Sequence, residues 1–340
     1  MSFNPVAVEQ LVIPQATAHQ MMVLLVAAGL DYVVGDPWHL PHPVQAMGTV
    51  ISAYSQWVLG HLRSKFWLRL AGIGLAAMLI IGSGMVSWAG LQILGRISPL
   101  LQQGSECVLL ASCFAGRSLR RAAHEVLAPL HQGNLVSARQ KLAMYVGRDT
   151  DRLSESDIYR AVLETVSENA IDGVLAPLFY AIVGATAGLA GPVAIAYKAA
   201  STLDSMVGYR REPYTHLGWF SARLEDALTW LPCRISVLGI AVLSRRPAHV
   251  LRLCRRDAIA DPSPNAGWSE CAYAAALGVQ LGGENSYKGK LTIKPLLGDA
   301  TRPITPHIIE EAFALTRRSF FIGLTIGSLS VMVTGLMATG

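Results

Sequence analysis

Long apolar runs without any charge alternate with polar blocks along this chain. The charge-free runs cover 70–95, 173–197 and 319–340, which are 26, 25 and 22 residues long. A helix needs about 20 apolar residues to cross the hydrocarbon core of a bilayer. These three runs therefore predict three membrane-embedded helices.

Two further apolar segments give weaker signals. Residues 10–30 are uncharged, but Pro14 limits the helix to about 19–34, with Asp31 near its end. Residues 227–244 carry Arg234 near their middle, and a central arginine costs about 2.5–3.5 kcal/mol on membrane insertion scales. This segment is either a membrane span or an interfacial or protein-buried helix. We expect an all-α polytopic membrane protein with about four to five membrane-embedded helical segments.

The polar parts of the chain fall between the apolar segments, and we expect them to be helical parts of one integral-membrane domain, 1–340. They are the blocks 35–69, 117–172, 198–226 and 245–318.

The block 117–172 shows where its helices begin and end. The amphipathic stretch SLRRAAHEVLAPL is followed by a break at 133–134, after which Ser137 is the expected N-cap of a second helix. Ser154 with Asp157 matches the S-x-x-D start signal. The pattern therefore predicts a third helix over 154–172.

Simple crossings would place successive polar blocks on opposite sides of the membrane, although their polar clusters suit one shared site. The run 173–197 is interrupted by GATAGLAGP at 184–192, so a re-entrant hairpin at 173–203 would return the chain to the same side. Such backbone is tolerated where protein buries it or where it lines a cavity. The segment 97–116, which begins with Ser98-Pro99 and holds Glu106, is a second candidate for a return.

Composition supports a membrane setting. Hydrophobic residues make up 52% of the chain and charged residues 15%, against about 25% charged in soluble domains. The net charge of +5 comes from basic residues at the borders of apolar runs, which is typical of cytoplasmic flanks and gives no reason to expect nucleic acid. Residues 1–20 lack Lys and Arg, so we expect no cleavable signal peptide. The five cysteines form no CxxC and are interpreted as small buried hydrophobes.

An acidic stripe marks the expected helix 154–172. Asp157, Glu164, Glu168 and Asp172 are 7, 4 and 4 residues apart, which places them on one face. Oxygen ligands in this pattern suit a divalent cation that bridges to phosphate. The alternative is a solvated helix face.

Three other clusters contain candidate binding residues. LDSMVGYRREPY (203–214) carries Arg210 and Arg211, suited either to phosphate recognition or to snorkelling at the membrane border. DPSPNAGW (261–268) and LGGENSYKGK (281–290) combine turn residues with polar side chains, a weak signal for anion binding. DYVVGDPWHLPHPV (31–44) contains Asp36 and His42 around a turn. No Walker A, HExxH, GxSxG or dinucleotide-binding motif is present, so the residues alone leave enzyme and transporter open.

Four long stretches nevertheless resemble one known family, the adenosylcobinamide-phosphate synthases (the CobD/CbiB cobalamin biosynthesis proteins), over about 22–325. They are LDYVVGDPWHLPHPVQAMG, VGRDTDRLSESDIYRAVLETVSENAIDGVLAPLFYA, AYKAASTLDSMVGYRREPYTHLGWFSARLEDALTWLPCRIS and DPSPNAGWSECAYAAALGVQLGGENSYKG. Lys198 and Ala200 stand where the family pattern leads us to expect Arg and Asn.

The resemblance implies an inner-membrane, multi-pass ligase of vitamin B12 synthesis with its active site facing the cytoplasm. It would join a propionate carboxylate of adenosylcobyric acid to (R)-1-amino-2-propanol or its O-phosphate. A carboxylate is a poor electrophile, so ATP would activate it as an acyl phosphate, with Mg²⁺ neutralising phosphate charge. Other enzymes of the corrinoid pathway are expected partners, besides the lipid bilayer. Rival hypotheses are a transporter or binding protein for a corrinoid or another anion, and a membrane scaffold.

The resemblance selects the candidate site positions, and the chemistry suggests their roles. Glu164, Glu168 and Asp172 would hold Mg²⁺, with Glu164 and Glu168 also counted as catalytic. Asp149 or Asp204 would take the proton of the attacking amine. The expected substrate-binding or nucleotide-binding residues are Asp36, His42, Arg148, Thr150, Asn169, Arg210, Arg211, Asn265, Asn285 and Tyr287.

Overall fold

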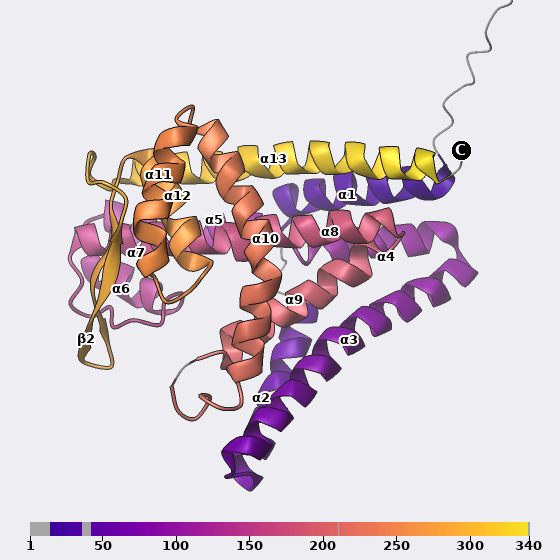
Figure 1. The fold of residues 1–340 in the computed structure, drawn as a ribbon, viewed down its shortest axis with the longest axis horizontal. Helices are drawn as coiled ribbons and strands as arrows, with labels where there is room; N and C mark the ends of the chain where they lie inside the picture. Colours follow the sequence, from indigo (N-terminus) through magenta and orange to yellow (C-terminus); the bar gives the residue numbers. More distant parts are fainter. Residues whose placement is uncertain (1–13, 36–41, 210, 339–340) are drawn as a thin grey trace, which may run out of the picture.

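The computed structural model describes residues 14–35, 42–209 and 211–338, and Figure 1 shows that it is almost entirely helical. Within this part of the chain, five helical segments are long and apolar enough to cross a membrane. The expectation of an all-α polytopic membrane protein with four to five embedded segments is thereby confirmed. The five segments are Gln15–Val33, Lys65–Ile97, Glu155–Thr186, Trp219–Leu243 and Pro306–Met337.

Four helices form the N-terminal third of the molecule: α1 (Gln15–Val33), α2 (Pro43–His61), α3 (Lys65–Ile97) and α4 (Pro99–Ala111). The helix α1 begins directly after Pro14. The 33 residues of α3 span about 50 Å at 1.5 Å per residue, more than the hydrocarbon core requires. Apolar side chains on α3, including Ile81, Met85 and Val86, are 60–74% exposed, as expected of a lipid-facing helix.

The chain returns at the end of α3. Ser98 ends α3, Pro99 begins α4, and α4 packs against α1 and α3. The buried carboxylate of Glu106 lies 3.0 Å from His19 Nε2 and accepts hydrogen bonds from Gln20 Nε2 (3.4 Å) and from the N–H of Gly191 (3.3 Å). These contacts secure the predicted return of segment 97–116.

The polar block that follows contains α5 (Gly116–His131), α6 (Leu135–Ala143) and α7 (Glu155–Ala170). The capping box that starts α7 is confirmed, because Ser154 and Asp157 exchange both expected hydrogen bonds. The N-cap expected for α6 is wrong. Asn134 caps this helix and accepts a hydrogen bond from the N–H of Ser137, because the break at 133–134 already contains a residue that favours N-caps.

The helix predicted to end at Asp172 continues through a π-helical turn, η1 (Ile171–Leu175), into α8 (Ala176–Thr186). The chain then turns at 187–189, where Gly188 has φ +73°, and α9 (Ala190–Val207) packs back against α8. A helical hairpin therefore lies at this position, with its first arm formed by the continuation of α7, and its re-entrant path in the membrane stays a prediction. A π-turn inside an α-helix frequently marks a functional position.

The C-terminal part consists of α10 (Trp219–Leu243), α11 (Pro247–Asp257), η2 (Ala258–Ala260), α12 (Ala266–Leu277), the strands β1 (Leu281–Tyr287) and β2 (Lys290–Leu297), and α13 (Pro306–Met337). Arg234 on α10 donates hydrogen bonds to Asn265 Oδ1 (3.2 Å) and to the carbonyl of Pro264 (2.8 Å), and it lies over the Trp268 ring. These protein contacts explain how α10 carries an arginine near its middle.

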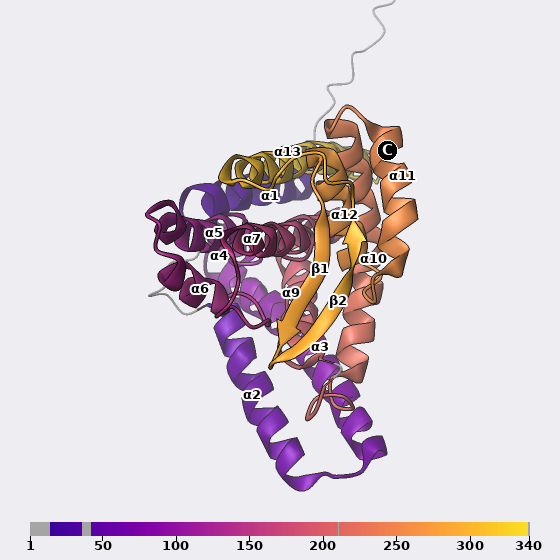
Figure 2. The ribbon, with the colours of Figure 1, turned by 90° about the vertical axis from the view of Figure 1, so that its left-hand side faces the viewer.

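The expectation that the block 245–318 is wholly helical is wrong at 281–297, where β1 and β2 form an antiparallel hairpin. Lys288 and Gly289 both have positive φ, as a tight two-residue hairpin turn requires. In Figure 2 the hairpin lies between α7 on one side and α10 and α12 on the other. It is the one pair of strands in the part of the chain that the structure describes.

Polar and apolar segments collect at opposite ends of the molecule. At the right-hand end of Figure 1 lie the α3–α4 turn, the end of α8 and the C-terminus of α13. The left-hand end holds α5, α6, α11, α12 and the hairpin. The returns at α4 and α9 therefore bring separate polar blocks to one end, as a shared site requires.

Candidate active site lined by carboxylates

Glu164 joins α7 to the β-hairpin. Its carboxylate accepts hydrogen bonds from Arg148 Nη2 (2.5 Å), from the N–H of Gly282 (2.9 Å) and from Arg160 Nη1 (3.4 Å). The side chains of Arg148 and Glu164 are only 7% and 2% exposed. This buried ion pair fixes the start of β1 on the inner face of α7.

The two arginines extend this attachment along β1. Arg148 Nη1 donates to Asn285 Oδ1 (2.7 Å). Arg160 donates to the carbonyls of Gly282 and Glu284, and it pairs with Asp157 at 3.1 Å. Arg148 and Asn285, which are 137 residues apart in sequence, are therefore direct neighbours, as a shared site for these two predicted residues requires.

Asp149 holds the hairpin turn. Its carboxylate accepts hydrogen bonds from the Ser286 hydroxyl (2.6 Å) and from the N–H groups of Gly289 (2.7 Å) and Lys288 (2.9 Å). These bonds, the one from Ser286 first, lower the pKa of Asp149. A carboxylate that is stabilised in its charged form is a weak proton acceptor, so the geometry favours the other predicted base, Asp204.

Carboxylates without hydrogen-bond donors line the interior next to this attachment. The side chains of Glu168, Asp172 and Asp204 are half-buried, and none accepts a hydrogen bond from a residue within the described ranges. Burial, with Asp226 and Glu168 nearby, raises the pKa of Asp204 to about 6. Asp204 lies outside the five candidate spans and is matched to proton transfer near neutral pH.

Helix α10 adds two acidic residues that the sequence reasoning did not select, Glu225 and Asp226. Glu225 is buried and accepts a hydrogen bond from Thr229 (2.5 Å), whose hydroxyl also pairs with that of Tyr197 (2.8 Å). Acidic residues within a membrane-embedded helix are costly and mark functional positions. That physical signal was available in the sequence at 225–226.

The donor chemistry of this interior fits Mg²⁺, which prefers carboxylate oxygens. In the described ranges, however, no three His, Cys, Asp or Glu side chains lie close enough together to hold an ion alone. Mg²⁺ often uses one or two carboxylates together with water and phosphate oxygens, so the residues fit an ion that arrives with a nucleotide. The site of Glu164, Glu168 and Asp172 stays a prediction, and Glu164 already has three protein partners.

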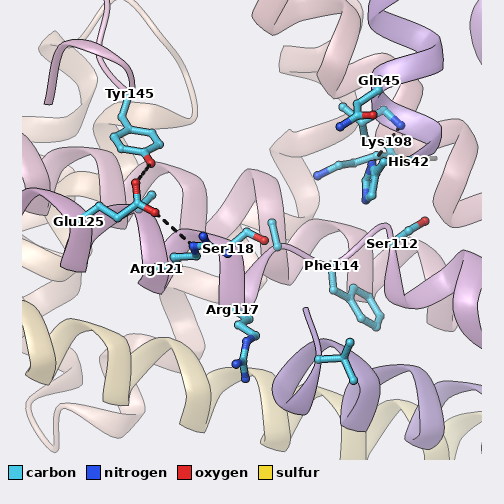
Figure 3. Close-up of a pocket in the computed structure, with 14 residues that line it drawn as sticks. His42, Gln45, Ser112, Phe114, Arg117, Ser118, Arg121, Glu125, Tyr145 and Lys198 are labelled. Atoms are coloured by element: carbon cyan, nitrogen blue, oxygen red, sulfur yellow. Dashed lines mark hydrogen bonds and ion pairs between the residues drawn. The ribbon is translucent and has the colours of Figure 1, made fainter. Parts of the chain in front are cut away.

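A separate cleft of about 310 Å³ runs beside α5. Figure 3 shows Lys198, His42 and Gln45 at one part of it, and Arg121, Glu125 and Tyr145 at another. Glu125 accepts hydrogen bonds from Arg121 (3.1 Å) and Tyr145 (2.8 Å). The cleft combines cationic and apolar lining, which suits a large ligand with anionic or amide groups.

A second cavity of about 240 Å³ shares Ala115, Ser118, Ala122 and Tyr145 with this cleft. It is also lined by Thr165 and Asn169 of α7. The predicted residues His42 and Asn169 therefore belong to one groove along α5, on a different face of α7 from Glu164 and Glu168.

The remaining predicted residues are placed as follows. Thr150 is buried and donates a hydrogen bond to the carbonyl of Arg139. Asn265 is buried and bonds the carbonyl of Asp226, so it joins α12 to the acidic part of α10. Arg211 is exposed and stacks on Tyr209, and Tyr287 ends β1, half-buried. Asp36 and Arg210 lie outside the described residues.

Comparison with known proteins identifies the family of this chain. The family model described as CobD/Cbib protein matches residues 24–316. The chain belongs to the CobD/CbiB family. The Cobalamin biosynthesis protein CobD of Synechocystis sp. is 51% identical over 309 residues, with 90% of each chain covered.

Two further relatives are more distant. The CbiB protein of Salmonella typhi is 43% identical, covering 84% of this chain and 89% of its own. The CobD protein of Halalkalibacterium halodurans is 39% identical, covering 89% and 93%. No solved structure matches the chain. The family predicted from the four motif stretches is confirmed. Three of the stretches contribute to α7, α9, α10, α12 and the hairpin, and the described residues of the first belong mainly to α1 and α2.

Proposed function

We propose that this CobD/CbiB chain acts in cobalamin biosynthesis as an ATP-dependent acid–amine ligase. It would join adenosylcobyric acid to (R)-1-amino-2-propanol or its O-phosphate and give adenosylcobinamide or its phosphate. Family membership supports the pathway. The observation that carries the reaction type is that the interior carboxylates of Glu168, Asp172 and Asp204 accept no hydrogen bond from the described residues. Such groups attract the cations that this ligation uses, a magnesium ion and an ammonium.

We assign Glu168 and Asp172 to the Mg²⁺ that accompanies ATP. The ion would neutralise phosphate charge while a corrinoid carboxylate oxygen attacks the terminal phosphorus, releasing ADP and leaving an acyl phosphate. Arg211, whose exposed side chain stacks on Tyr209, is the proposed phosphate ligand on the 208–218 loop, together with Arg210. The guanidinium of Arg148, which donates a hydrogen bond to Asn285, lies at the same interior.

The amine must lose a proton before it can attack the acyl carbon. We assign this proton to Asp204, whose carboxylate accepts no hydrogen bond within the described ranges and whose pKa is raised to about 6. The new C–N bond then forms as the phosphate leaves, and the second nitrogen proton passes to phosphate or water. Asp149 keeps the hairpin turn in place.

The groove along α5 is the proposed corrinoid site. Its cationic residues, including Arg117, Arg121 and Lys198, suit the carboxylate and amide side chains of a corrinoid. We place the polar end of the molecule on the cytoplasmic side of the inner membrane, because ATP is there and because Arg245, Arg246, Arg317 and Arg318 follow the positive-inside pattern.

The test is incubation of detergent-purified protein with adenosylcobyric acid, Mg²⁺, ATP and either amine, followed by mass spectrometry. An amide adduct that requires ATP is the expected result, and the amine with the higher kcat/KM is the preferred substrate. Corrinoid binding without an adduct from either amine would refute the ligase and favour a transport role.

A further inference from the structure

A second group of interior polar side chains lies where α12 and the hairpin meet. Glu270 on α12 is fully buried, and its Oε1 lies 3.6 Å from Nζ of Lys294 on β2. Among the described residues, none donates a hydrogen bond to either Glu270 oxygen or to the buried Oδ2 of Asp261. Buried polar atoms are almost always hydrogen-bonded, so these open acceptors indicate that a ligand supplies the donors.

The charges of this group are unbalanced. Burial alone would lower the pKa of Lys294, but the nearby carboxylates of Glu270, Glu164, Glu168 and Asp261 raise it. Glu168 is assigned to Mg²⁺, so Glu270 and Asp261 against the one ammonium of Lys294 leave one negative charge when all three groups are ionised. Glu164 does not change this balance, because Arg148 and Arg160 pair with it. Burial, with Glu168 and Glu164 nearby, also raises the pKa of Glu270 to about 8, so a cationic ligand beside Glu270 would relieve the cost of its buried charge.

The open groups suit an alkylammonium better than a bare metal ion. Within the described ranges no three acidic or imidazole side chains converge at metal-binding distance, whereas Mg²⁺ requires oxygens near 2.0–2.1 Å in octahedral geometry. Lys294 shows that an alkylammonium fits beside Glu270. An ammonium brings three N–H donors, which matches acceptors that lack partners.

The hairpin also offers an unused donor. Asn285 is 2% exposed, and its Oδ1 accepts a hydrogen bond from Arg148. Its buried Nδ2 finds no acceptor in the part of the chain that the structure describes. In the register of the hairpin, Lys294 pairs with Gly283, two positions from Asn285, so both side chains lie on the face toward α7 and α12. The junction of α12 and the hairpin thus presents open acceptors for an ammonium and an open donor for an oxygen atom.

We propose that Glu270 and Asp261 bind the ammonium group of the amine substrate, while Asn285 binds the oxygen on its adjacent carbon. The ligand class is a small amino alcohol or its phosphate ester. This assignment rests on the proposed ligase function and gives the β-hairpin a specific task, that of forming one wall of the amine site. Glu164, Arg148 and Asp149 position this wall.

The test compares Glu270→Gln with Glu284→Gln, a control with the same chemical change at an exposed position of the β-hairpin. Steady-state kinetics with detergent-purified protein would give KM values for the amine, ATP and adenosylcobyric acid. E270Q should raise the amine KM at least tenfold and leave the other two KM values within twofold, while E284Q changes none. In calorimetric titrations without the other substrates, aminopropanol should bind wild-type protein, and propane-1,2-diol, which lacks the ammonium, should not.

Each other outcome has a defined meaning. If E270Q leaves the amine KM unchanged, the amine site is refuted. It is equally refuted if E270Q raises the KM for ATP or the Mg²⁺ requirement instead of the amine KM. If E270Q does not fold, Asp261→Asn is the second variant, with the same expected direction and the same refutation. Amine binding that depends on Glu270, without amide formation by the wild type, would support the site and refute the ligase function.

Discussion

Replacing Glu164 by alanine should release the β-hairpin from α7. The substitution leaves Arg148, whose side chain is 7% exposed, without its carboxylate partner, and it removes the acceptor of the Gly282 N–H. Removing one member of a buried ion pair costs about 3–5 kcal/mol. In E164A, Arg148 would keep its hydrogen bond to Asn285, and Arg160 would keep its ion pair with Asp157 and its hydrogen bonds to two carbonyls. We therefore expect a cost at the lower end of this range, about 3 kcal/mol.

Because 1.4 kcal/mol corresponds to a factor of ten, this change would raise the detached population of the hairpin about 100-fold. The assay is limited trypsin digestion of detergent-purified protein, with cleavage after Lys288 and Lys290 followed by mass spectrometry. Both lysines are exposed, but a protease needs several residues in an open, extended conformation, so cleavage reports local detachment. E164A should be cut about 100-fold faster than wild type.

The control is Glu284→Ala on the same hairpin, whose exposed side chain should contribute little. Equal cleavage rates for E164A and wild type would refute the conclusion that the Arg148–Glu164 pair holds the hairpin. Equal acceleration by E284A would show that cleavage reports a property of the hairpin alone.

Three further perturbations test other parts of the structure. Asp204 must be ionised to accept a proton, and its pKa is raised to about 6, so ligase kcat/KM should fall about tenfold per pH unit below pH 6. D204N should remove most activity at every pH. A pH profile of kcat/KM that stays flat to pH 5 would contradict this role. E106A removes the hydrogen-bond acceptor for Gln20 and for the Gly191 N–H. It should lower stability in detergent melts by about 1–3 kcal/mol, and E106Q should stay closer to wild type. Equal melting of E106A and wild type would exclude a stabilising role for these bonds. A Cβ at Gly327 would lie 2.2 Å from Ile182, so G327A should lower the melting temperature by the equivalent of about 1–3 kcal/mol. The control G82A, whose Cβ would have no atom within 4 Å, should leave the melting temperature unchanged. A G327A variant as stable as wild type would show that the contact between α8 and α13 adjusts freely.

Hydropathy and local motifs were sufficient to predict much of the fold. Charge-free runs predicted the spans because lipid exposure imposes length and composition on a helix. The Ser154–Asp157 start of α7 was predictable because its hydrogen bonds are local. The returns at α4 and α9 were predictable from a proline after α3 and a glycine-rich break after α8, since both residues end helices.

Contacts between distant segments were beyond sequence reasoning. Asp149 was expected as a base, but it caps a turn formed by residues 286–289, and no local pattern links these positions. The hairpin was hidden because glycines at 282 and 283 resemble a loop as readily as a strand. Glu270 and Lys294 were missed because a single charge in an apolar helix or strand shows neither its partner nor its burial.

The central claim is that ATP activates a corrinoid carboxylate for amide formation. Adenosylcobyric acid labelled with ¹⁸O in its reacting carboxylate, incubated with this protein, Mg²⁺, ATP and the preferred amine, tests it most directly. We expect one ¹⁸O atom to appear in the released phosphate and the other in the new amide, because the carboxylate oxygen that attacks ATP leaves with phosphorus. Amide product with unlabelled phosphate, or labelled substrate that is bound but not converted, would contradict the account.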